Sequence, residues 1–173
     1  GRWFRCKEVH RTPGKTGAAM LFTAADNAVK SGRKLFGFFG TTYSHLPFRT
    51  ADGKFDPVKG GAASRYDAEA YESEDITENP SLDEMTMAAI KVLSAEGGPF
   101  WLLVEAGDVD WANHDNNIDN SIGAVLSGIE AYQEISSWVT KHRAWRDTAI
   151  IVTADHGHLL VINDFTVFYR RGD

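Results

Sequence analysis

Two short clusters of acidic residues and histidines each follow directly after an apolar run, and this arrangement constrains the fold most. The first apolar run covers residues 100–104 and the second covers residues 147–152. Both runs are short and continuous rather than alternating, which is typical of strands buried on both faces of a parallel sheet. In open α/β folds, ligands bind beyond the carboxyl ends of such strands. The pattern therefore predicts an α/β fold with a ligand site at that edge.

The residue types in the two clusters indicate a metal centre. The clusters contain Glu105, Asp110, His114, Asp155 and His156. Asp110 and His114 are four positions apart, so on a helical turn their side chains share one face and can reach one ion. A turn at Gly157 would let the adjacent Asp155 and His156 face the same site. Carboxylate and imidazole groups suit zinc, and magnesium is favoured where oxygen ligands predominate.

The same residues have a simpler interpretation when each is taken alone. Acids and histidines that follow strands often cap helices or lie in solvated loops. Five such residues together at two predicted strand ends favour a metal centre over separate capping roles. The activity expected of such a centre is metal-assisted hydrolysis. His158, two positions after His156, is expected to support the site or the fold rather than to bind a metal ion.

The spacing of these residues resembles that of the alkaline phosphatases. The sequence Val-Glu-x-Gly-x-x-Asp-x-x-x-His covers residues 104–114, and Ile-Val-Thr-Ala-Asp-His follows about forty positions later at residues 151–156. A further apolar run at residues 34–40, ahead of a His-Leu-Pro loop, is similar to the segment that precedes this region in the family. The resemblance extends from about residue 15 to about residue 160.

The resemblance implies an α/β fold of three layers, α/β/α, with a mainly parallel central sheet that is incomplete in this chain. We expect a single partial domain over residues 1–173 with an irregular insertion at about residues 41–80. The loops that carry metal ligands would cover about residues 105–117 and 154–158.

Carried over residue by residue, the resemblance implies two Zn²⁺ ions and one Mg²⁺ ion. Asp110 and His114 would bind the first zinc, Asp155 and His156 the second zinc, and Glu105 the magnesium. Trp111 occupies a position near the phosphate where many relatives have a histidine or a lysine. It would change phosphate affinity or release without removing a metal ligand.

The activity that the resemblance implies is hydrolysis of phosphate monoesters through a phosphoserine intermediate, with inorganic phosphate as product. In the family, the nucleophilic serine and the phosphate-clamping arginine belong to a segment that would precede residue 1. The third ligand of the first zinc belongs to a later segment. We therefore expect a middle-to-late part of a longer enzyme. Two alternatives stay open, namely a metal- or phosphate-binding module without turnover, and a related phosphodiesterase or sulfatase.

The composition of the chain limits the classes of molecule that it is expected to bind. A formal net charge of −6 argues against nucleic-acid binding, because such proteins usually display a basic face. The charge is compatible with a phosphate substrate, since bound zinc and magnesium would reverse the local field. The single cysteine, Cys6, cannot form an internal disulfide, and no apolar stretch reaches transmembrane length. The resemblance alone implies a periplasmic or extracellular location and a homodimer.

Local signals predict three helices. One covers residues 23–30 with Thr23 as its cap, and another opens at a capping box formed by Ser81 and Glu84. The longest covers residues 118–138 and would pack its apolar stripe on the sheet. That stripe consists of Ile122, Val125, Leu126, Ile129, Tyr132 and Ile135. Asn116 and Asn117, just before this helix, are expected to satisfy the loop backbone.

Overall fold

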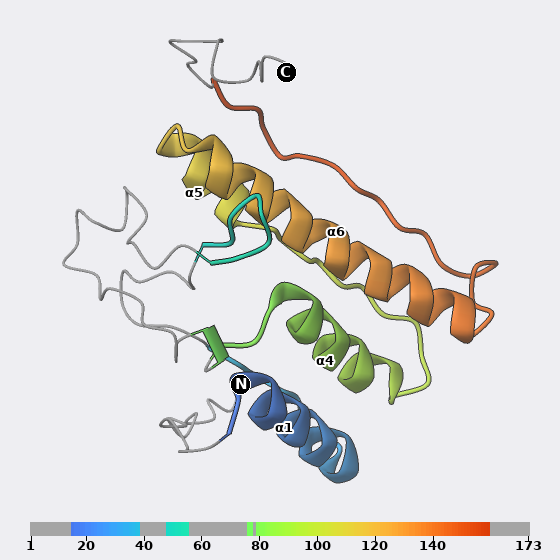
Figure 1. Ribbon diagram of the computed structural model, residues 1–173. Helices are drawn as coiled ribbons and strands as arrows, with labels where there is room; N and C mark the ends of the chain where they lie inside the picture. Colours follow the sequence, from blue (N-terminus) through green and yellow to red (C-terminus); the bar gives the residue numbers. More distant parts are fainter. Residues whose placement is uncertain (1–14, 39–47, 56–75, 78, 160–173) are drawn as a thin grey trace, which may run out of the picture.

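A layer of helices forms the body of the molecule in a computed structural model that describes residues 15–38, 48–55, 76–77 and 79–159. The helices are α1 (Gly17–Ser31), α4 (Leu82–Ser94), α5 (Asp108–His114) and α6 (Ile118–Lys141). Helix α4 packs against both α1 and α6, and the short α5 packs against α6 (Figure 1). None of these helices is both long and apolar enough to cross a bilayer.

The cap of helix α1 lies seven residues earlier than the sequence predicted. This cap is Thr16, whose side-chain oxygen accepts a hydrogen bond from the Ala19 N–H at 3.2 Å. Thr23 lies inside the helix, where its hydroxyl donates to the Ala19 carbonyl at 2.8 Å. The earlier start buries Leu21 against α4, so tertiary packing decides between the two threonine caps. Helix α1 ends at Gly32, which adopts a left-handed conformation with φ 60°.

The predicted starts of the other two helices are confirmed. Helix α4 opens at the Ser81 capping box, where the Glu84 carboxylate accepts a hydrogen bond from the Ser81 N–H at 2.8 Å. Helix α6 opens at Asn117, whose side-chain oxygen accepts a hydrogen bond from the Asn120 N–H at 3.1 Å. Asn116 turns the chain between α5 and α6 with φ 56°, a conformation that asparagine tolerates better than most residues.

The segment of residues 48–55 is fastened to α6. Its Arg49 side chain forms an ion pair with Glu130, and the Ala51 N–H donates to the Asp119 carboxylate at 2.9 Å. Gly123 of α6 lies directly against the backbone of Arg49. The remainder of the predicted insertion, except residues 76–77 and 79–80, lies outside the described residues.

The predicted three-layer α/β/α fold with a central parallel sheet is wrong for the part of the chain that the structure describes. Residues 34–38, 100–104 and 147–152 have no strand structure there. A strand needs a ladder of backbone hydrogen bonds to a neighbour, and the described residues contain one isolated bridge, between Arg49 and Phe55.

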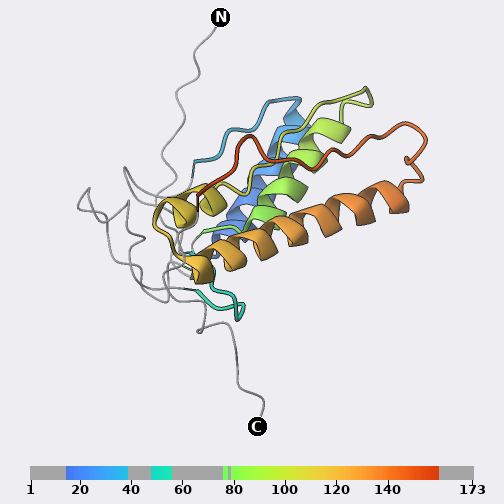
Figure 2. The same cartoon turned by 90° about the horizontal axis from the view of Figure 1, so that it is seen from above.

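The apolar runs instead lie as irregular segments on one side of the helix layer (Figure 2). Their outer side chains remain in solvent, with Trp101 82% and Val152 79% exposed. Their inner side chains, such as Leu102 and Ile150, are half-buried. The continuous apolar runs predicted segments with side chains buried on both faces. In the structure, side chains on only one face of each segment are partly buried.

The apolar stripe predicted for α6 also differs from the structure. Ile122, Val125, Ile129 and Tyr132 keep 44–46% of their surface exposed. The residues that α6 buries are mainly small, among them Gly123, Ala124 and Ala131. The stripe was expected to cover a sheet, and it is left half-exposed because no sheet packs on it among the described residues. Small residues instead permit the close approach of neighbouring segments.

Replacement of Gly123 by alanine tests that close approach. Helix propensity alone would favour alanine by about 1 kcal/mol. The added Cβ would instead overlap the Arg49 carbonyl and the Thr50 nitrogen, which are backbone atoms and cannot rotate away. We expect Gly123→Ala to lower the free energy of unfolding by about 1–3 kcal/mol in urea denaturation. Gly98→Ala, where a Cβ meets nothing within 4 Å, is the control. Equal stability of Gly123→Ala and the wild type would refute the packing described.

Candidate metal centre

Helix α5 brings the first two predicted ligands together. Asp110 and His114 lie one helical turn apart, and the Asp110 Oδ2 and His114 Nε2 atoms are 3.5 Å apart. The helix is held in place by its packing on α6, to which the turn at Asn116 joins it. The prediction that these two side chains share one face of a helical turn is confirmed.

The second cluster approaches the same carboxylate from a distant part of the sequence. His158 Nε2 lies 2.7 Å from Asp110 Oδ1, and His156 Nε2 lies 3.5 Å from that oxygen. The His158 ring also contacts the His114 ring edge-on, with 4.7 Å between centroids. Asp110 is therefore the point at which both clusters meet.

The donor atoms of Asp110, His114 and His158 lie within 4.8 Å of one another. Tetrahedral zinc with bonds of about 2.0–2.1 Å separates its ligand atoms by about 3.3 Å, close to the Asp110–His114 spacing. The Asp110 carboxylate and the His114 imidazole are both donor types that zinc accepts. The spacing of these two donor atoms thus fits a zinc ion.

His158 and His114 differ in their ability to bind a metal ion next to Asp110, because His158 forms a hydrogen bond to that carboxylate. An ionised carboxylate only accepts hydrogen bonds, so the contact of 2.7 Å requires the His158 Nε2 atom to donate a proton. A ring nitrogen that carries this proton cannot use the same atom to bind a metal ion. His158 is thus placed to orient Asp110, and its side chain is only 16% exposed.

The other predicted site residues lie outside the cluster of Asp110, His114 and His158. Asp155 is 87% exposed, and its carboxylate is 3.5 Å from His156 Nε2. His156 Nε2 is in turn 3.5 Å from Asp110, so His156 lies between Asp155 and the cluster. Glu105 lines a neighbouring cavity rather than the three-residue cluster. Trp111 follows Asp110 on α5 and is 37% exposed.

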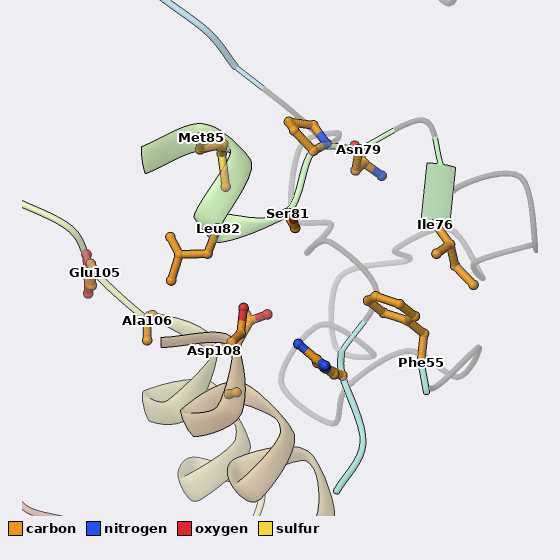
Figure 3. A pocket seen from close by; sticks show the side chains of 14 residues that line it. Phe55, Ile76, Asn79, Ser81, Leu82, Met85, Glu105, Ala106 and Asp108 are labelled. Carbon is orange, nitrogen blue, oxygen red and sulfur yellow. The ribbon is translucent and has the colours of Figure 1, made fainter. Parts of the chain in front are cut away.

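That cavity contains a residue that sequence analysis missed. The cavity has a volume of about 230 Å³, and the Asp108 carboxylate points into it from the start of α5 (Figure 3). Burial raises the pKa of Asp108 to about 6. Arg49 lies in the same wall, and its pKa is raised by its hydrogen bond to Glu130. No local pattern marks these residues, because their surroundings come from segments far apart in the chain.

Comparison with known proteins shows a family relationship. A family profile described as alkaline phosphatase matches residues 55–171. The chain is similar to alkaline phosphatase 3 of Bacillus subtilis (strain 168), with 36% identity over 77 residues, 44% of this chain and 16% of that protein. It is also similar to alkaline phosphatase 4 of that strain, with 33% identity over 97 residues, 56% of this chain and 19% of that protein.

The alkaline phosphatase of Gadus morhua is 32% identical over 114 residues, 66% of this chain and 21% of that protein. No solved structure matches the chain. The chain spans about a fifth of the length of these relatives. The family profile nevertheless covers more than half of this sequence, and the chain belongs to the alkaline phosphatase family.

Proposed function

We propose that this chain is part of a metal-dependent hydrolase of phosphate monoesters that releases inorganic phosphate. The observation that carries the proposal is the convergence of Asp110 and His114 with His156 and His158, from segments separated by more than forty positions. Family membership supports the reaction class. The phosphoserine of the proposed mechanism would form on a serine outside this chain.

We assign two zinc ions and one magnesium ion to the predicted residues. Asp110 and His114 hold the first zinc, Asp155 and His156 the second zinc, and Glu105 the magnesium. The short distance from His156 to both Asp110 and Asp155 supports two adjacent zinc positions, because one imidazole lies between the two carboxylates. When bound, such ions polarise the phosphoryl group and stabilise the leaving oxygen.

The side chains around the ligands have supporting roles in this proposal. His158 donates its Nε2 proton to Asp110 and fixes the direction of that carboxylate, as hydrogen-bonded neighbours of metal ligands commonly do. Trp111 presents a partly exposed indole next to Asp110. It would contact the phosphate side of the site and alter product release. We also assign the parent protein to the periplasm or the cell exterior, as a homodimer.

A zinc titration of the 173-residue chain tests the ligand assignment. We expect Asp110→Asn to weaken zinc binding by at least about 100-fold in isothermal titration calorimetry, because even residues behind the ligands change affinity by 10–100-fold. Asp147→Asn replaces an exposed acid outside the cluster and should bind zinc like the wild type. Unchanged zinc affinity in Asp110→Asn would contradict the assignment.

Turnover by the parent enzyme tests the reaction. We expect Asp155→Ala to reduce hydrolysis of para-nitrophenyl phosphate by more than about 100-fold, because it removes a ligand of the second zinc. Asp147→Asn serves again as the control and should retain activity. Full activity of Asp155→Ala would exclude this ligand. Faster wild-type turnover of bis-para-nitrophenyl phosphate or para-nitrophenyl sulfate would favour a phosphodiesterase or sulfatase, and no turnover of any ester would favour a binding module.

A further inference from the structure

Large apolar side chains lie exposed on the segments that contain the three apolar runs. Figure 1 and Figure 2 show that these segments cross the helix layer in the same direction. The exposed side chains on them each keep 72–82% of their surface in solvent. We call this set the outer apolar surface, and it consists of Phe36, Phe38, Trp101, Leu103, Ile151 and Val152.

Alternation along the chain shows that these segments are packed on one side and open on the other. Trp101 and Leu103 are 82% and 78% exposed, whereas Leu102 between them is half-buried. Leu35 likewise packs against the buried core between α1 and α4, and the next residue, Phe36, is 72% exposed. Successive side chains of an extended backbone point to opposite sides. The outer apolar surface therefore faces away from the helices.

The size of the outer apolar surface distinguishes it from ordinary exposed side chains. Single exposed apolar residues are common on proteins. An aromatic side chain offers about 150–250 Å², so the three aromatic members, which are 72–82% exposed, present roughly 350–550 Å². The three aliphatic members add to this area, whereas the largest apolar patch on a typical monomer is about 300–600 Å². An apolar surface of this size is typical of a contact with another part of a protein.

We propose that the outer apolar surface is an internal contact of the parent protein, covered by apolar side chains of a segment outside residues 1–173. The length of the relatives supports this occupant, because the matched regions make up only 16–21% of those proteins. Most of each relative's chain therefore lies outside the matched region. The inference shares with the proposed function only the premise that the chain is part of a longer protein.

Hydroxyl-radical footprinting of the parent protein, read by mass spectrometry, tests the proposal. Trp101 and Trp145 are compared within one molecule, because two tryptophans have the same intrinsic reactivity. In this chain Trp101 is more exposed than Trp145, at 82% against 49%. We expect this order to reverse in the parent protein, where the ratio of Trp101 labelling to Trp145 labelling falls below one. A ratio above one would overturn the proposal, because the outer apolar surface would then still face solvent.

The 173-residue chain, labelled at the same protein concentration, distinguishes a further segment from a second copy. We expect its Trp101 to be labelled faster than Trp145, and Ile151 faster than Ile90, which are 76% and 2% exposed. Protection of Trp101 and Ile151 in a chain that sediments as a dimer would overturn the proposal, because a second copy would then cover the surface. Labelling does not depend on turnover, so an inactive parent protein with a protected Trp101 would contradict the proposed function and support this inference.

Discussion

The hydrogen bond between His158 and Asp110 is the contact on which the candidate site depends. It joins two segments that are 48 positions apart and that share no regular hydrogen-bonded structure among the described residues. Asp110 itself is fixed by α5, which is only seven residues long and relies on its packing against α6. A short helix is marginal alone, so tertiary contacts maintain the position of the carboxylate. The position of the candidate ligands Asp110 and His114 is therefore a consequence of helix packing.

The environment around α5 gives its two aspartates different properties. Asp110 lies within 3.5 Å of the imidazole nitrogens of His114, His156 and His158. Asp108 faces a largely apolar cavity, and burial raises its pKa to about 6. Two carboxylates separated by one residue thus point to different surroundings, because successive helical positions turn by about 100°. Of the two, Asp110 belongs to the cluster that could hold a metal ion.

Local features of the structure were predictable from the sequence, and features that need a distant partner were not. The capping box of Ser81 and Glu84 acts within one turn, so its role could be read from the sequence. The shared face of Asp110 and His114 is likewise local. The apolar runs were compatible with strands, yet strand formation depends on neighbours that the described residues do not supply. The pairing of Arg49 with Glu130 joins positions 81 apart and left no signal in either segment.

A crystal structure of the 173-residue chain soaked with zinc, with anomalous scattering recorded at the zinc edge, would show directly whether Asp110 and His114 bind the metal. We expect a zinc peak about 2.0–2.2 Å from a carboxylate oxygen of Asp110 and from a ring nitrogen of His114. His158 would keep its hydrogen bond to Asp110 in that structure. A zinc peak bound elsewhere, with none at Asp110, would contradict the account.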